Sequence, residues 1–267
     1  MRSHQQIVPN EPGSLSFQEK QEDGDEAKYK CIRFFNLLIL PNFGEFMGSF
    51  IFSFLACFAG QYQRSNDLVY PFLSGFSLYI ARNLVANLTP AHLNPAVTLL
   101  QWFRNEIPLV LAFTFCLDQL IGFLLGVTLF RTLVTQTEFN DYIVMYEIVA
   151  VEGVRKINRL QAFLLEVFLS MIYFMAHSLE ERQDSTVAAA WGFIQLVSYP
   201  LYGFTSNVTL LLVTSTVSYI FSPSTTPSFL LLYLNVFASL AAVLMAWCVD
   251  IASRPSAPES EDKKSTN

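Results

Sequence analysis

The sequence has 267 residues, of which 52% are hydrophobic and 14% are charged, whereas a soluble domain carries about 25% charged residues. Its 16 Lys and Arg are outnumbered by 22 Asp and Glu, which leaves no basic surface for nucleic acid. These numbers exclude an ordinary soluble enzyme and a nucleic-acid-binding protein, and they leave an integral membrane protein.

Both ends of the chain are polar and rich in charge. We therefore expect residues 1–33 and 251–267 to be disordered, solvated tails. The first thirty residues contain no basic segment followed by an apolar run, so no cleavable signal peptide is expected.

Six apolar stretches are long enough to cross a hydrocarbon core of about 30 Å. They are residues 43–62, 68–88, 107–130, 160–179, 187–204 and 228–250. Two shorter apolar segments, 94–103 and 207–219, follow the second and the fifth stretch and are typical of half-length helices.

The same series of three spans and one short segment occurs twice. It predicts two repeats, about 43–130 and 160–250, within one channel domain of residues 34–250. Because each repeat has three spans, the two repeats must enter the membrane in opposite orientations. An even number of spans places both tails on one side, and a small bias of Lys and Arg favours the cytosol.

The first short segment carries readable chemistry in Asn94, Pro95 and Ala96. Asn is a good N-cap, and Pro suits the first helical position. A half-helix that starts inside the membrane points its unpaired N–H groups and its positive dipole end into the bundle, where the Asn amide can donate to a passing solute. Such a site repels cations.

Enzyme chemistry is not expected. His4 lies in a tail, His92 in a loop and His177 at a helix end, and the four cysteines are far apart without a CxxC pair. The spans contain no paired carboxylates, so we expect no catalytic residues, no metal site and no cofactor.

The run AHLNPAVTL resembles the first signature of the aquaporin, or major intrinsic protein, family. Glu45 within GEFMG, Glu166 within QAFLLEV and Gln119 within DQLIG are similar to that family's first, fourth and third helices. The resemblance covers about residues 43–250. It implies an all-α bundle of six transmembrane helices and two re-entrant half-helices in a lipid bilayer, usually a homotetramer with one pore for water or small neutral solutes in each subunit.

The second signature departs from the family pattern. Asn207, Val208, Thr209 and Leu210 stand where Asn-Pro-Ala-Arg is expected, so the Asn remains and the Arg is absent. An alternative alignment of the two VTLL strings places Val208 at the Arg position. The chain is also similar to the divergent, largely intracellular branch of the family, so the plasma membrane and the endoplasmic reticulum both stay open.

Counting from the two asparagines as the family does assigns the selectivity filter. Its four positions are Ser74, Gln195, Phe204 and Leu210. A ring without a cation strips water with less compensation, which favours small polyols or peroxide over fast water flow. The alternative is that Phe204 and Leu210 pack together and close the pore, in a non-conducting or gated relative with a structural or regulatory role.

Four charged residues within the spans need partners. We expect Glu45 and Glu166 to accept hydrogen bonds from the re-entrant loops. From their similar depths we expect Arg82 to pair with Asp118. The rival interpretation is that Arg82 projects into the cytosolic vestibule as a cation barrier.

Overall fold

The computed structural model describes residues 28–60, 68–143, 150–151, 154–155, 157–179, 183–203, 206–221 and 229–254. Within this range the chain divides into two compact units, which end and begin at Pro41 and Asn42. The remaining parts of the two predicted tails, residues 1–27 and 255–267, and the predicted filter residue Phe204 lie outside the described residues.

The described part of the first unit is helical. Residues 28–34 form an α-helix, and η1 (Phe35–Ile39) is π-helical, because the N–H of Leu40 donates to the carbonyl of Phe35, five residues back. Residues 28–33 and 251–253 were predicted to belong to disordered tails, and this prediction is wrong for both segments, because both are helical. The apolar run that favours a helix begins at Phe34, and the helix extends six residues upstream of it.

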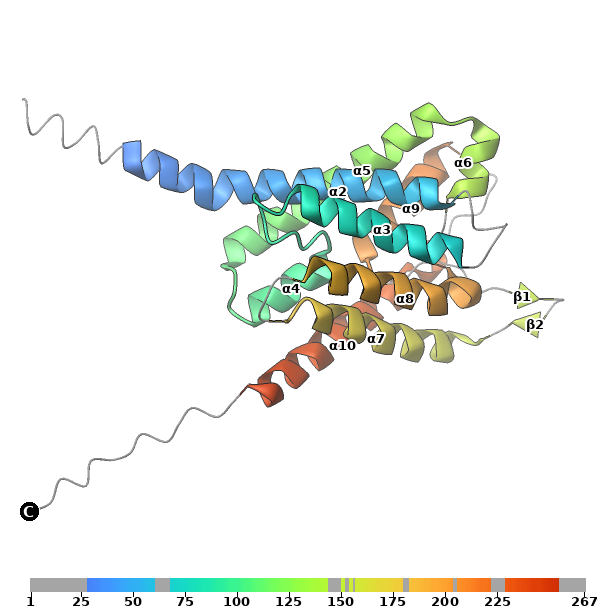
Figure 1. Ribbon diagram of the computed structural model, residues 1–267. Coiled ribbons are helices and arrows are strands. Elements are labelled where there is room, and N and C mark those ends of the chain that lie inside the picture. Colours follow the sequence, from blue (N-terminus) through green and yellow to red (C-terminus); the bar gives the residue numbers. More distant parts are fainter. Residues whose placement is uncertain are drawn as a thin grey trace, which may run out of the picture. The chain divides into compact units, whose positions relative to one another are not determined.

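The second unit contains the repeated pattern (Figure 1). Its first set of helices is α2 (Leu40–Ala59), α3 (Val69–Leu84), the short α4 (Pro95–Phe103) and α5 (Leu109–Leu133). Its second set is α7 (Arg159–Ala176), α8 (Asp184–Tyr202), the short α9 (Val208–Phe221) and α10 (Phe229–Ser253). Between the sets lie α6 (Gln136–Tyr142) and a hairpin of β1 (Ala150–Val151) and β2 (Val154–Arg155), which pair antiparallel.

Four of the described helices are long and apolar enough to cross a membrane by themselves: Lys28–Ala59, Leu109–Leu133, Arg159–Ala176 and Leu231–Ser253. The sequence predicted six spans, and the other two, α3 and α8, are shorter or more polar than these four. The helix α3 has only 16 residues and carries Arg82 and Asn83 at its end, while α8 begins with Asp184 and contains Gln195 and Ser198. These polar side chains belong to the interior described below.

The helices that flank the hairpin begin with capping boxes. The N–H of Thr135 donates to Glu138 Oε2 (2.8 Å), and the N–H of Glu138 donates to Thr135 Oγ1 (3.3 Å). The first of these bonds lowers the pKa of the exposed Glu138 carboxyl, because it favours the charged form. Asn158 and Gln161 make the same pair of bonds at the start of α7.

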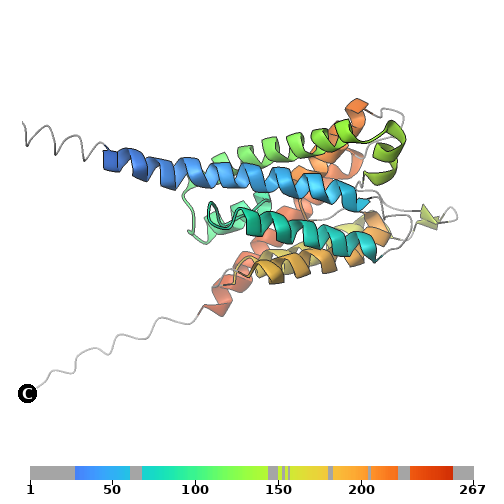
Figure 2. The ribbon, with the colours of Figure 1, turned by 45° about the horizontal axis from the view of Figure 1, so that its top comes forward.

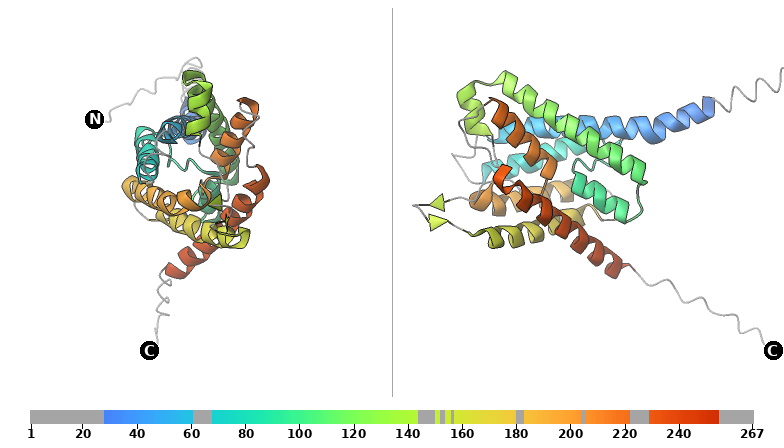
Figure 3. Two further views of the ribbon diagram at one scale, coloured as in Figure 1. Left: turned by 90° about the vertical axis from the view of Figure 1, so that its right-hand side faces the viewer. Right: turned by 180° about the vertical axis from the view of Figure 1, so that it is seen from behind.

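Glycines set the closest helix contacts. A Cβ at Gly122 or Gly126 of α5 would overlap backbone atoms of α2, and a Cβ at Gly75 of α3 would lie 2.9 Å from the carbonyl oxygen of Ala188. The helix α3 runs beside α8 (Figure 2), and α9 lies against both α5 and α10 (Figure 3). These contacts bring α4 and α9 to the interior, where they meet.

Candidate pore

Each half-helix begins at a buried asparagine. Asn94 has extended backbone angles, and its Oδ1 accepts a hydrogen bond from the N–H of Ala96 (3.0 Å), with Pro95 in the first turn of α4. Asn207 Oδ1 accepts from the N–H of Leu210 (3.1 Å) at the start of α9. Both asparagines therefore act as N-caps, although only the first is followed by proline.

The two caps also bond to each other's loops. Asn94 Nδ2 donates to the carbonyl of Ser206 (2.5 Å), and Asn207 Nδ2 donates to the carbonyl of Leu93 (2.9 Å). Each bond uses one of the two hydrogens of a carboxamide. The half-helix N-termini are thereby tied together, and their dipoles place partial positive charge at one point of the interior.

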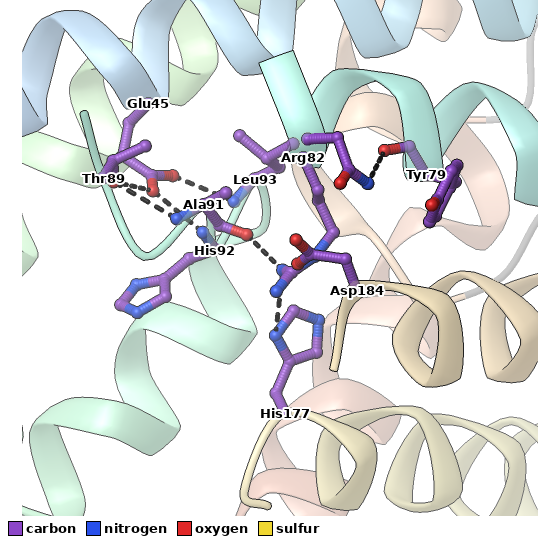
Figure 4. Close-up of polar contacts among 10 residues, drawn as sticks. Glu45, Tyr79, Arg82, Thr89, Ala91, His92, Leu93, His177 and Asp184 are labelled. Carbon is purple, nitrogen blue, oxygen red and sulfur yellow. Dashed lines mark hydrogen bonds and ion pairs between the residues drawn. The ribbon is translucent and has the colours of Figure 1, made fainter. Parts of the chain in front are cut away.

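Glu45 of α2 holds the first loop. Its Oε1 accepts hydrogen bonds from the N–H of His92 (2.8 Å) and from Thr89 Oγ1 (2.6 Å), and its Oε2 accepts from the N–H of Leu93 (2.9 Å) and from Gln119 Nε2 (2.7 Å). Figure 4 shows the carboxylate facing this loop. The fully buried carboxylate thus accepts four hydrogen bonds, which compensate the loss of its hydration.

Glu166 of α7 has the equivalent place in the second repeat. Its Oε1 accepts from the N–H of Ser206 (2.7 Å), from Asn235 Nδ2 (2.7 Å) and from Ser170 Oγ (3.4 Å). Asn235 lies on α10, as Gln119 lies on α5, so in each repeat the carboxylate joins the loop to the last long helix. Asn235 was not among the residues predicted from the sequence, although an amide inside an apolar span is a usable signal.

The two loops have unusual backbone angles at the residues whose carbonyls accept side-chain hydrogen bonds. Ala91, Leu93 and Ser206 have φ values of 55°, 50° and 64°, a region that non-glycine residues seldom occupy. The carbonyls of these three residues accept hydrogen bonds from Arg82, Asn207 and Asn94. The side-chain bonds therefore hold the loops in a conformation that costs energy on its own.

Arg82 is paired with Asp184, and the pair with Asp118 predicted from the sequence is wrong. Arg82 Nε lies 2.8 Å from Asp184 Oδ1, and the guanidinium also donates to the carbonyl of Ala91 (Figure 4). His177 Nδ1 lies 3.3 Å from the same guanidinium. Asp118 is half-buried on α5, a helix that contacts α4 and α9, whereas Arg82 lies on α3 beside α8.

Arg82 also lines a polar cavity of about 770 Å³ at the ends of α3, α4, α7 and α10. His92, Gln101, Arg104, His177 and Asp250 are among the residues that line it. In this respect the rival interpretation of Arg82, a position in the vestibule on the tail side, agrees with the structure. Its charge is not an open barrier, because Asp184 compensates it.

Three of the four predicted filter residues lie within the described part of the chain, and all three are buried. Ser74 and Gln195 are 0% exposed, and Leu210 is 1% exposed. The hydroxyl of Ser74 accepts a hydrogen bond from the indole N–H of Trp191 (2.9 Å). The Ser74 hydroxyl is therefore already hydrogen-bonded to Trp191 of α8, a residue that was not among the predicted site residues.

Trp191 belongs to a buried aromatic cluster. Its ring packs edge-on against Phe52 (5.5 Å between centroids) and Tyr173 (5.1 Å), and the side chain of Tyr173 interacts with that of Asn94. Two of these rings could have been predicted from the repeat, since Phe52 and Tyr173 lie seven residues after Glu45 and Glu166. That spacing places ring and carboxylate on the same inward face of the helix.

A model of the major intrinsic protein family matches residues 39–223, a range that includes both asparagine-capped half-helices. The chain belongs to the major intrinsic protein family. Among solved structures, the X-ray structure of the aquaglyceroporin from Plasmodium falciparum is similar, with a TM-score of 0.66 and 19% sequence identity over 79% of this chain and 95% of that chain. No curated protein matches the chain in sequence.

As a major intrinsic protein, the chain is an integral membrane protein with an aquaporin-like α-helical fold. Members of this family are membrane channels for water and small solutes rather than enzymes. The likeness to the aquaglyceroporin, at 19% identity, supports the fold. In this chain Asn stands at both half-helix starts, and only the first Asn is followed by Pro and Ala.

Proposed function

We propose that this major intrinsic protein is a passive channel for small uncharged solutes, such as glycerol or hydrogen peroxide, through which water moves slowly. The observation that supports it best is the buried leucine at position 210, three residues after the cap Asn207. An apolar side chain there offers a passing water no hydrogen bond, so the cost of stripping the water is less compensated.

The same proposal accounts for the exclusion of ions. No arginine is needed at the filter if the positive ends of α4 and α9 meet at Asn94 and Asn207. The remaining hydrogen of each carboxamide can then be offered to a solute hydroxyl. A molecule with both hydroxyl and apolar surface suits a ring of Ser74, Gln195, Phe204 and Leu210.

Replacing Leu210 by arginine tests the assignment of the filter. A new charged donor contributes about 1.5–3 kcal/mol per hydrogen bond, which predicts a rise of at least about tenfold in the ratio of water to glycerol permeability. Stopped-flow light scattering of proteoliposomes measures both. Leu210→Met, which keeps size and polarity, is the control. Identical permeabilities in Leu210→Arg and in the parent would show that this ring is not the constriction.

A non-conducting or gated relative is the second candidate, with a structural or regulatory role in the membrane. The burial of Ser74, Gln195, Leu210 and both caps favours it, because these side chains are at most 1% exposed in this conformation. Proteoliposomes of the unmodified chain distinguish the two. Flux equal to that of empty liposomes for water, glycerol, urea and peroxide supports the second candidate and rejects the first.

Assembly and topology complete the proposal. We expect a homotetramer with one pore in each subunit, in the plasma membrane or the endoplasmic reticulum, and both termini in the cytosol. The mass of the detergent-solubilised particle, measured by light scattering, tests the first expectation. Protease protection of terminal epitope tags in sealed vesicles tests the second.

A further inference from the structure

We propose that Trp191 is the gate of this pore: its indole closes the path between the filter position Ser74 and the cap Asn94, and conduction requires the ring to leave. The inference rests on the proposed channel function and names the element that regulates it. The contacts that support it form one continuous column of side chains across the interior of the bundle.

The column begins and ends at polar groups of the candidate pore. At one end, the indole N–H donates to Ser74 Oγ (2.9 Å). In the middle, Trp191 packs edge-on against Tyr173, with 5.1 Å between centroids. At the other end, Tyr173 interacts with the carboxamide of Asn94. Ser74 and Asn94, which would bind a solute, are thus linked by a row of contacts through Trp191 and Tyr173.

The rings fill the space between these ends. Phe52, Tyr173 and Trp191 come from α2, α7 and α8, and their exposed fractions are 0%, 1% and 0%. Phe52 closes the third side of the indole, with 5.5 Å between centroids. Hydrophobic constrictions of this kind stop conduction because water does not enter them.

Ser74 explains how a solute would compete with the ring. Its hydroxyl interacts with Tyr70, one turn earlier in α3, in addition to accepting from Trp191. A hydroxyl has one hydrogen and two acceptor sites, so the indole takes a position that a solute hydroxyl would otherwise use. A polyol or peroxide can therefore enter only as the hydrogen bond between the indole and Ser74 breaks. This coupling selects solutes that can donate a hydrogen bond to Ser74 in its place.

The experiment compares Trp191→Ala with Trp247→Ala in proteoliposomes, by stopped-flow measurement of water and glycerol flux. Trp247 packs on Phe103 between α10 and α4, away from the aromatic column, and so controls for the loss of a tryptophan. Removal of the gate predicts a rise of more than about tenfold in both fluxes, and Trp247→Ala should leave them at the level of the unmodified chain.

A milder pair of variants covers the case in which Trp191→Ala does not fold. Ser74→Ala removes only the acceptor of the indole bond, and loss of one buried hydrogen bond predicts about a fivefold shift toward the open population. Ser77→Ala is the control, because Ser77 Oγ bonds to the carbonyl of Leu73 within the same helix. No change in flux in Ser74→Ala would then overturn the gate.

The outcomes separate the gate from the channel function. If the unmodified chain conducts and neither Trp191→Ala nor Ser74→Ala changes the flux, the proposed gating role of Trp191 is wrong and the proposed channel function is supported. If the unmodified chain matches empty liposomes and Trp191→Ala conducts, the gate stands and the unmodified chain is a sealed pore. If no variant conducts, both proposals are wrong.

Discussion

At the scale of single residues, the most demanding group is Arg82. Its side chain is 4% exposed, and the opposing Asp184 side chain is 11% exposed, so both charges have left water. Such pairs are stable only when the remaining donors and acceptors are also used. The carbonyl of Ala91 and the ring of His177 serve this purpose, and they connect the end of α3 to the first loop and to the end of α7.

Replacing Arg82 by alanine should therefore destabilise the fold strongly. It leaves the half-buried carboxylate of Asp184 without its cation, a change whose cost approaches the ~3–5 kcal/mol measured for fully buried pairs. Thermal unfolding in detergent measures the loss. Arg254→Ala is the control: Arg254 also bonds a carboxylate, Asp250, but is 49% exposed, and exposed pairs contribute less than about 1 kcal/mol. Equal shifts in both variants would contradict the assignment.

Glu45 gives a second prediction at this scale. In Glu45→Gln, an NH₂ group replaces an oxygen that accepts from the loop N–H groups of His92 or Leu93. The new NH₂ group would face a backbone N–H group, and the hydrogen bonds to a charged acceptor would be lost. Together these changes should lower the free energy of unfolding by more than about 3 kcal/mol. The control is Glu138→Gln, in an exposed capping box, where a small change is expected. If the unfolding temperatures of the two variants match, Glu45 does not support the loop as described.

The sequence allows some of these residues to be predicted and not others. The caps Asn94 and Asn207 and the carboxylates Glu45 and Glu166 lie in local patterns with characteristic neighbours. The partner of Arg82 lies 102 residues away in the other repeat, and counting depths along helices does not tell which helices touch. Asp118 has a suitable depth on α5, but α5 packs on α4 and α9 rather than on α3.

At the scale of helices, close contact of α3 with α8 depends on small residues. Gly75 faces the backbone of Ala188 and Gly192, and a Cβ would approach them to 2.9 Å and 3.1 Å. The polar positions Ser74 and Gln195 lie on the same two helices, so their separation is set at this contact. Both helices are less suited to cross a membrane alone than the other long helices, because α3 is short and both carry polar side chains.

Enlarging Gly75 should separate the two helices. Gly75→Leu inserts a side chain where backbone already lies, and such overpacking costs about 1–3 kcal/mol or more. We expect a lower unfolding temperature and an altered flux, measured on the same purified protein. Ala189→Leu is the control, since Ala189 is exposed on α8 near this contact. A Gly75→Leu protein as stable as Ala189→Leu would contradict the close approach.

The half-helices are the elements that sequence predicts best. An Asn-Pro pair before a short apolar run fixes the start of α4, and the structure begins that helix at Pro95. The second start, at Val208, lacks the proline and is recognised by its repeat position. The start of the first helix was placed too late, because residues 28–33 carry three charges and give no apolar signal.

At the scale of the whole molecule, the second unit repeats one plan twice. Each repeat joins a carboxylate, a loop capped by asparagine and an amide on the last long helix, through Glu45 and Gln119 or through Glu166 and Asn235. The plan is present in the second repeat although Val208 and Thr209, rather than Pro and Ala, follow its Asn. The hydrogen bonds that hold the half-helices are thus equivalent in the two repeats.

The ratio of glycerol to water permeability in proteoliposomes of the unmodified chain tests this account most directly. Both fluxes are recorded by stopped-flow light scattering on one preparation, with empty liposomes of the same lipid as the blank. The account predicts glycerol flux above the blank and water flux raised by a smaller factor, because Leu210 offers water no hydrogen bond. Fast water flux with glycerol at the blank level would contradict it.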